Sequence, residues 1–81
     1  MVVTISDVRN VLIANGNEAA DYLSNENLEK AVFWNELKMD SLDFEDLKGD
    51  IEYEKNVIVP NALSLNDTVK EFIDRINGSN L

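Results

Sequence analysis

The sequence predicts a single all-α domain that spans residues 1–81. Apolar residues recur at helical spacing in three stretches of the chain, and the aromatic residues that favour strands make up only 7% of it. Hydrophobic residues reach 44%, which is enough to form a core. The chain has no cysteine and no histidine, so neither a disulfide nor an ordinary zinc site can stabilise the fold, and the core must form from apolar side chains alone.

The first helix is expected to begin near Thr4 and to end at Asn15-Gly16. Thr4 and Asp7 have the spacing of a capping box, with Asp in place of the usual Glu. Asn followed by Gly is a plausible C-terminal stop. Between these limits the apolar residues that follow helical spacing are Ile5, Val8, Val11 and Leu12.

Residues 16 to 40 are expected to form a long loop. Residues 18 to 23 can form one or two helical turns, whereas Asn25 and Asn27 favour loop structure. The segment is too rich in large apolar residues to be a free linker, so we expect it to fold over the ends of the helices, with Trp34 either partly exposed or buried. These apolar residues are Leu28, Phe33, Trp34 and Leu37.

The second helix is expected to begin at Asp40 or Ser41. Either side chain can cap it, and Asp43 places negative charge in its first turn, where the helix dipole favours it. The residues expected to mark successive turns are Leu42, Leu47 and Ile51, followed by Glu54 or Lys55.

The outer face of this second helix is almost purely acidic. Gly49 in its middle costs roughly 1 kcal/mol relative to alanine, and it predicts a weak point, a kink or a close contact. Repulsion among the carboxylates, together with Gly49, predicts a stability that depends on salt or divalent cations. The acidic residues assigned to this face are Asp43, Glu45, Asp46, Asp50 and Glu52.

The last part of the chain is expected to form an extended segment and a final helix. Val57-Ile58-Val59 has strand character, but it is isolated and Pro60 follows it, so a single extended segment is expected. Ser64-Leu65-Asn66-Asp67 resembles a capping box that starts the helix, Asn77-Gly78 ends it, and residues 79–81 should fray. The apolar stripe of this helix is Val69, Phe72, Ile73 and Ile76.

The charge of the chain limits its partners. Sixteen Asp and Glu residues against seven Lys and Arg give a net charge of −9, which argues against nucleic-acid binding and against anionic membrane surfaces. The same charge favours proteins with basic docking patches, although an acidic surface can also serve solubility alone. No stretch approaches the ~20 apolar residues of a membrane span, and Met1-Val2-Val3-Thr4 lacks the basic start of a signal peptide. A cytoplasmic monomer is expected.

The segment Asp40-Ser41-Leu42-Asp43 is the feature that carries chemistry. No histidine is present to act as a neutral-pH base for Ser41, and no other acid–base or metal constellation is seen, so the protein is not expected to be an enzyme. A serine that opens a helix suits the attachment of a phosphate-linked group, because a helix start offers free N–H groups and the positive end of the dipole. A role as a helix cap alone is the alternative.

The stretch from Phe33 to Asp43 resembles the signature of the acyl carrier protein family. In that family a Phe, then an acidic residue and a Leu, precede Asp-Ser-Leu-Asp. Asp-Ser-Leu alone is a weak motif, whereas its combination with the length, the charge and the later segments is much more specific. The resemblance covers about residues 28 to 78 well and the first helix loosely. The other matching residues are Leu47, Glu52, Val59-Pro60, Thr68-Val69 and Phe72-Ile73-Asp74-Arg75-Ile76-Asn77-Gly78.

The resemblance implies a small four-helix bundle with a long loop between the first two helices and a short third helix. It implies that Ser41 carries 4′-phosphopantetheine through a phosphodiester, and that the terminal thiol of this arm holds an acyl group as a thioester. Asp40 matches the family residue that helps a phosphopantetheinyl transferase to bind magnesium. The pathways implied are fatty-acid, polyketide or related specialised biosynthesis.

The resemblance also implies how partner enzymes dock. Acyl-transfer, condensing and modifying enzymes would place basic patches on the acidic second helix. The residues implied in this docking are Leu42, Asp43, Glu45, Asp46 and Glu52. An aminoacyl or peptidyl carrier fits the net charge and the Leu-Asp after the serine less well. A different class of function, an acidic helical interaction module that keeps the fold but carries no arm, is the alternative.

Several residues depart from the family pattern and indicate a divergent or specialised carrier. Lys38 stands where the family usually has Gly, and Lys55 lies near a position usually held by a buried Phe, a space that Tyr53 could fill instead. On the second helix, Glu45 and Gly49 stand where common fatty-acid carriers have apolar residues, and Lys48 adds positive charge.

Overall fold

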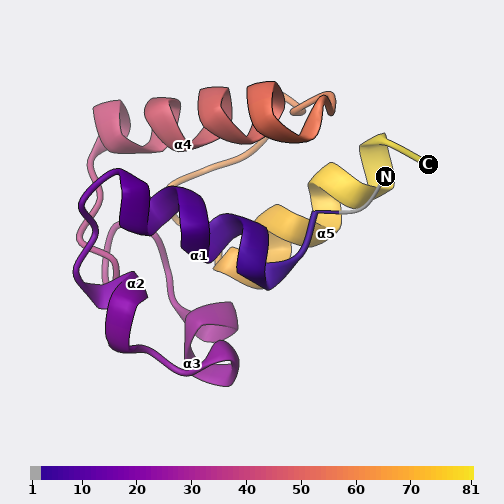
Figure 1. Cartoon of the computed structure of the whole chain (residues 1–81). Coiled ribbons are helices and arrows are strands. Elements are labelled where there is room, and N and C mark those ends of the chain that lie inside the picture. The colour runs from indigo at the N-terminus through magenta and orange to yellow at the C-terminus, as the bar shows by residue number, and fades with distance from the viewer. Residues whose placement is uncertain (1–2) are drawn as a thin grey trace.

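The computed structural model describes residues 3–81. Met1 and Val2, which belong to the stretch predicted not to start a signal peptide, lie outside the described residues. Figure 1 shows α4 along one side of the molecule, α1 and α5 beneath it, and α2 and α3 on the side away from α4. No β-strand occurs in the described range, where one isolated antiparallel bridge pairs Val32 with Thr68. The all-α class is confirmed. The helices are α1 (Ile5–Ala14), α2 (Ala19–Tyr22), α3 (Asn25–Lys30), α4 (Ser41–Lys55) and α5 (Val69–Ser79).

The predicted limits of the first helix are confirmed. Thr4 is the N-cap of α1, and its hydroxyl accepts a hydrogen bond from the N–H of Asp7 at 3.2 Å. The carboxylate of Asp7 in turn accepts from the N–H of Thr4 at 2.9 Å, which completes the capping box. Asn15 is the C-cap, and Gly16 follows with a φ of 84°, a left-handed conformation that glycine adopts without steric cost.

The loop prediction is correct at α2 and wrong at residues 25–30. Ala19–Tyr22 forms the expected short helical turn. Asn25 and Asn27, assigned to a loop, lie in α3, because Ser24 caps this helix by accepting a hydrogen bond from the N–H of Asn27 at 3.1 Å. Leu28 anchors α3 in the core, so tertiary packing outweighs the weak helix propensity of the asparagines.

The phase of α4 differs from the prediction at Leu42. The helix begins at Ser41 with Asp40 as its N-cap, as expected, but Leu42 is 73% exposed. Phe44 takes the inward position instead, because residues 44, 47 and 51 share one face of a helix that starts at Ser41. Leu47 is buried, as predicted.

Gly49 lies at neither a kink nor a close contact. Gly49 is exposed, and a Cβ placed there would meet no atom within 4 Å. Helix α4 runs without interruption from Ser41 to Lys55, and its ribbon in Figure 1 is straight. The expected kink and close contact are therefore wrong. What remains is the conformational cost of glycine in a helix interior.

The segment between α4 and α5 contains turns and no short helix. Asn56 ends α4 in the left-handed region, at a φ of 51°, and residues 57–60 run on without secondary structure, as predicted for Val57-Ile58-Val59. Residues 61–62 and 65–66 form turns where the acyl-carrier resemblance implies a helix. The short helices of this chain lie before α4 instead.

The predicted start of the last helix is wrong by four residues, because the N-cap is Thr68 and not Ser64. Ser64 and Asp67 do pair, since the carboxylate of Asp67 accepts from the N–H of Ser64 at 2.9 Å, but this bond closes a turn. Helix α5 begins at Val69, where Thr68 and Glu71 form the capping box. Thr68 also has an acid three residues on, Glu71, and it stands directly before Val69, the first residue of the apolar stripe.

Helix α5 is longer than predicted, and hydrogen bonds fix the residue that follows it. The helix runs two residues past Asn77 to Ser79 and includes Gly78. The side chain of Asn80 accepts from the N–H of Ile58 and donates to its carbonyl, both at 2.7 Å. These bonds tie residue 80 to the extended segment, so the fraying predicted for it is wrong.

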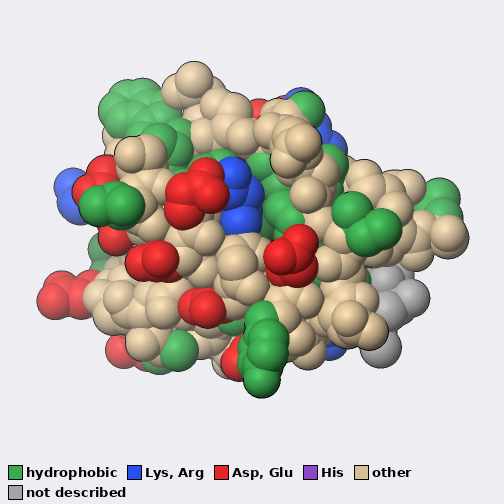
Figure 2. Space-filling model, turned by 90° about the horizontal axis from the view of Figure 1, so that it is seen from above, with side chains coloured by type: hydrophobic (Ala, Val, Ile, Leu, Met, Phe, Trp, Pro, Cys, Tyr) green, Lys and Arg blue, Asp and Glu red, His purple; other side chains and the backbone are tan. Residues whose placement is uncertain are grey.

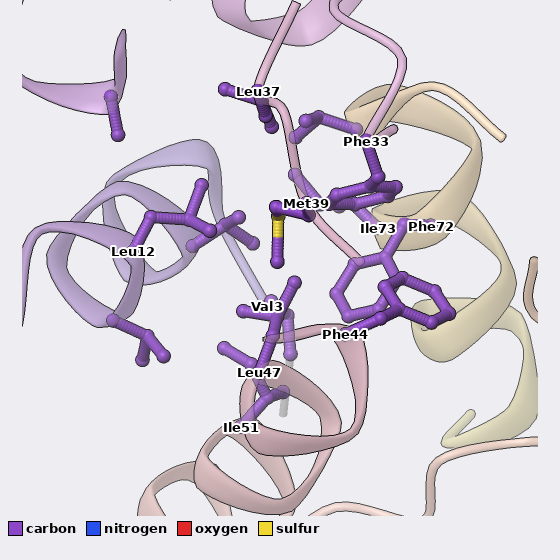
Figure 3. Packing of buried hydrophobic residues seen from close by; sticks show 14 of the residues in the cluster. Val3, Leu12, Phe33, Leu37, Met39, Phe44, Leu47, Ile51, Phe72 and Ile73 are labelled. Carbon is purple, nitrogen blue, oxygen red and sulfur yellow. The ribbon is translucent and has the colours of Figure 1, made fainter. Parts of the chain in front are cut away.

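Three phenylalanines from separate segments form the centre of the core (Figure 3). The ring centroid of Phe33 lies 5.0 Å from that of Phe44 and 5.2 Å from that of Phe72, at tilted and edge-to-face angles that favour aromatic pairs. The predicted apolar stripe of α5 is buried against this centre, as are Leu28 and Leu37. Trp34 is 54% exposed. The core thus joins the segment before Ser41 to α4 and α5.

The residue at the family's glycine position, Lys38, adopts a φ of 52°. A left-handed conformation costs a residue with a side chain about 1–2 kcal/mol, whereas glycine loses about 0.5–1 kcal/mol of extra chain entropy on folding. We therefore expect Lys38→Gly to raise the free energy of unfolding by about 0.5–1 kcal/mol in urea titrations. Lys38→Ala is the control, because it removes the same charge and keeps the backbone cost. Equal stability of the two variants would contradict this account.

Two capping-box acids make the stability depend on pH. Burial raises the pKa of Asp7, but hydrogen bonds from Thr4 and Lys55 outweigh burial and hold this pKa below the ordinary 3.8. The N–H and hydroxyl of Thr68 lower the pKa of Glu71 below its ordinary 4.5. A carboxyl group with a lowered pKa contributes stability above its unfolded-state pKa, and this contribution is lost as the pH falls through its folded-state pKa.

The Glu71→Gln variant isolates this effect, since Gln can keep the capping box without titrating. We expect the difference in free energy of unfolding between the native protein and Glu71→Gln to be largest at pH 7 and to shrink as the pH falls below about 4.5. Urea titrations at several pH values measure this difference. Taking the difference cancels the titration of the other carboxylates. A difference that does not change with pH would contradict the assignment.

Candidate functional site

Ser41 is the first residue of α4 and is exposed. Asp40 caps the helix by accepting from the N–H of Asp43 at 2.9 Å, and the carboxylate of Asp43 accepts from the N–H of Asp40 at 3.1 Å. The N–H groups of Ser41 and Leu42 have no hydrogen-bond acceptor among residues 3–81. The hydroxyl of Ser41 is thus presented at a helix start with free donors, a geometry that fits a phosphate group.

The predicted docking residues share the exposed side of α4. Figure 2 views this side of the molecule and shows more acidic than basic side chains on it. Leu42 lies at the Ser41 end of this face and Tyr53 at the far end, and both are exposed. Tyr53 is 88% exposed, so the suggestion that it fills a buried Phe position is wrong. The acidic residues assigned to this face, all exposed, are Asp43, Glu45, Asp46, Asp50 and Glu52.

The two lysines that depart from the family pattern on α4 are both paired. The ammonium group of Lys48 lies 2.8 Å from the carboxylate of Glu45 and 5.1 Å from the ring centroid of Phe44. The ammonium group of Lys55 lies 3.3 Å from the carboxylate of Asp7 and so links the end of α4 to α1. Both lysines therefore contribute to packing as well as to charge.

An open groove of about 440 Å³ lies next to the start of α4, and the sequence did not predict it. Met39 and Asp43, which flank Ser41 in the chain, are among its lining residues. The buried side chains of Leu12, Leu37 and Met39 give it an apolar floor, and Figure 3 shows Leu12 on α1 and the other two on the segment before Ser41. Only the three-dimensional fold brings α1, α2 and the residues before Ser41 to one place.

Asn17 holds the walls of this groove together. Its N–H donates to the carbonyl of Leu12 and its side-chain amide to the carbonyl of Leu37, both at 2.9 Å. Its side-chain oxygen accepts from the N–H of Ala20 at 3.2 Å. One asparagine therefore connects the end of α1, the start of α2 and the segment before Ser41. The polar sequence around it predicted only a loop.

Two further findings concern the function classes. The described residues contain no group of three or more Asp, Glu, His or Cys side chains placed to hold a metal ion. In the same part of the chain, none of the helices has the length and apolar character needed to cross a membrane. Comparisons of the chain with family models, with curated proteins and with solved structures find no match.

Proposed function

We propose that this protein is an acyl carrier that bears a 4′-phosphopantetheine arm on Ser41. The observation that carries the proposal is the exposed hydroxyl of Ser41 at the start of α4, beside an open groove and next to two N–H groups that have no acceptor among residues 3–81. The arm would supply a thiol, which this chain lacks because it has no cysteine. The resemblance from Phe33 to Asp43 supplies the identity of the group.

Ser41, Leu42 and Asp40 would each have a role in the attachment of the arm. Coenzyme A is the donor: the Oγ atom of Ser41 would give its proton to a base of the transferase and form a bond to the phosphorus next to pantetheine. The phosphoanhydride bond would break, and adenosine 3′,5′-bisphosphate would leave with its electron pair. The free N–H groups of Ser41 and Leu42 would stabilise the phosphodiester. Asp40 would share a magnesium ion with the transferase.

The exposed acidic side of α4 is the proposed docking surface for partner enzymes. The exposed carboxylates there would meet Arg and Lys residues, and the exposed side chain of Leu42 would enter an apolar contact beside Ser41. The proposed partners are the transferase and then acyl-transfer, condensing and modifying enzymes of fatty-acid, polyketide or related biosynthesis. The cytoplasmic location and the monomeric state stay predictions.

Intact mass spectrometry tests the proposal. The purified protein is incubated with coenzyme A, magnesium and a broad-specificity phosphopantetheinyl transferase. We expect the native chain to gain the mass of one phosphopantetheine unit and Ser41→Ala to gain none. Ser79→Ala is the matched control, because Ser79 lies at the far end of α5 and should leave the modification intact.

No gain of mass in native protein that is folded by circular dichroism would contradict the carrier proposal. That result would favour the second candidate, an acidic helical module that docks basic partners without an arm. The net charge of −9 and the exposed carboxylates of α4 support this second candidate equally well. The two proposals differ only in what happens at Ser41.

A further inference from the structure

The chain contains two asparagines that are followed by glycine, Asn15-Gly16 and Asn77-Gly78. The backbone nitrogen of the residue after an asparagine can attack the side-chain amide. Glycine favours this attack because it has no Cβ in the way and allows a wide range of backbone angles. We propose that Asn15 deamidates spontaneously, that the fold protects Asn77, and that the carboxylate formed at residue 15 weakens the contact between α1 and α4. The proposal goes beyond the carrier function and does not depend on it.

The reaction at Asn15 needs water and no enzyme. The backbone nitrogen of Gly16 gives its proton to hydroxide or water and forms a bond to the Cγ atom of Asn15. The bond between this carbon and the amide nitrogen breaks, and the nitrogen leaves with the electron pair and takes up a proton to become ammonia. Water then opens the cyclic imide at one of its two carbonyl groups. The products are aspartate and isoaspartate, in which the main chain runs through Cγ, so an amide is replaced by a carboxylate.

The fold leaves Asn15 open to this reaction. Asn15 and Gly16 are both exposed, and Gly16 lies just past the end of α1 with a φ of 84°. The side-chain amide of Asn15 donates to the carboxylate of Asp50 at 3.2 Å, in a hydrogen bond that is exposed to solvent. The attacking N–H of Gly16 donates to the carbonyl of Ile13 at 2.9 Å. This bond belongs to the end of the helix, where local opening costs least.

Asn77 has the same neighbour but different surroundings. Asn77 and Gly78 lie inside α5, which continues to Ser79, and Asn77 is partly buried. The side chain of Asn77 accepts from the N–H of Val3 at 2.7 Å and donates to its carbonyl at 3.1 Å. Both bonds must break and the helix must unwind before the nitrogen of Gly78 can reach the side-chain carbon. The chain thus holds the same pair of residues once in an open turn and once in a fixed helix.

A carboxylate at residue 15 would meet negative charge from two sources. The amide that donates to Asp50 would be replaced by a second carboxylate facing it. The residue is also the C-cap of α1, where the helix dipole disfavours negative charge and the last turn has no basic residue. Because α1 runs beside α4 and contacts it (Figure 1), deamidation would replace an attraction between the two helices by a repulsion.

Peptide mapping by mass spectrometry measures both sites in one sample. Native protein is incubated in mildly alkaline buffer and digested at intervals. A carboxyl methyltransferase that acts on isoaspartate, with labelled S-adenosylmethionine, identifies that product. We expect Asn15 to react at least about tenfold faster than Asn77, a ratio that corresponds to about 1.4 kcal/mol in the barrier. In concentrated urea, where the fold is lost, we expect the two rates to become similar, because glycine follows both asparagines.

Two variants measure the consequence for α1 and α4. Asn15→Asp introduces the charge of the product, whereas Asn15→Gln keeps an amide and does not readily form the five-membered ring. We expect Asn15→Asp to unfold at a lower urea concentration than Asn15→Gln. The difference should shrink in about 1 M salt, where the screening length falls to about 3 Å. Asn15→Gln should also lose the methyl incorporation that the native chain shows at residue 15.

The outcomes test the site and its effect separately. No reaction at Asn15, or a rate equal to that of Asn77 in folded protein, would overturn the assignment of the site. Equal urea midpoints for Asn15→Asp and Asn15→Gln would overturn the effect on the contact between α1 and α4. A difference in midpoint that is unchanged by salt would contradict its electrostatic origin.

Discussion

Replacing Phe33 by alanine is expected to lower the free energy of unfolding by about 3–5 kcal/mol. The side chain of Phe33 is completely buried, and its ring contacts those of Phe44 and Phe72 at centroid distances of 5.0 and 5.2 Å. Alanine would leave a cavity where three segments meet, and the neighbouring rings can fill it only in part. A domain of this size has about 4–12 kcal/mol of stability, so the variant should be close to unfolding at room temperature.

Urea titration followed by circular dichroism measures this loss, with two variants for comparison. Tyr53→Ala removes an aromatic ring that is 88% exposed and should change the free energy of unfolding by no more than about 0.5 kcal/mol. Phe33→Leu keeps most of the volume and should fall between the two. If Phe33→Ala loses as little as Tyr53→Ala, the three rings do not form the centre of the core.

Local signals explain which parts of this fold could be predicted. The capping box at Thr4, the cap at Asp40 and the apolar stripe of α5 each lie within a few residues of the helix that they define. Short-range patterns of this kind are fixed by backbone geometry alone. The same holds for the exposure of Ser41, because the first residue of a capped helix faces solvent unless another element covers it.

The failures have equally specific causes. Leu42 and Phe44 are both apolar and lie two residues apart, so the sequence alone does not decide which of them faces the core. Phe44 does so because its ring packs against that of Phe33. The sequence does not predict helix α3, because Asn25 and Asn27 favour loops. The burial of Leu28, which stabilises this helix, depends on contacts with α1 and α5. Propensity is a weak guide where tertiary contacts decide the outcome.

Long-range bonds of asparagine side chains could not be predicted at all. The side chain of Asn77 donates to the carbonyl of Val3 at 3.1 Å and accepts from its N–H at 2.7 Å, across 74 positions of the chain. The side chain of Asn80 likewise donates to the carbonyl of Ile58 and accepts from its N–H, and the side chain of Asn17 donates to the carbonyl of Leu37. A sequence shows that an asparagine is present but not which distant backbone it will meet. Such a bond helps to build the groove beside Ser41, which is why the sequence predicts Ser41, Asp40 and the docking residues of α4 but not the groove.

Asp67→Ala is expected to lower the free energy of unfolding by about 1–3 kcal/mol. Asp67 is 9% exposed, and its Oδ2 atom accepts from the N–H of Ser64 at 2.9 Å and from the guanidinium group of Arg75 at 3.0 Å. Its backbone carbonyl also accepts from the N–H of Phe33 at 3.3 Å. The side-chain bonds fix the turn that carries this carbonyl, so their loss should loosen the contact between residues 64–67 and the core.

The neutral variant Asp67→Asn decides which of the two side-chain bonds matters more. Arg75 is about half exposed, so the ion pair should contribute less than about 1 kcal/mol, and Arg75→Ala alone should cost no more than that. The N–H of Ser64, by contrast, is partly buried and has no other acceptor among the described residues. Asparagine keeps an oxygen for this N–H, and we therefore expect Asp67→Asn to retain most of the stability that Asp67→Ala loses. Equal losses in urea titrations of Asp67→Asn and Asp67→Ala would mean that the charge on Asp67, and not the closed turn, holds this segment against α5.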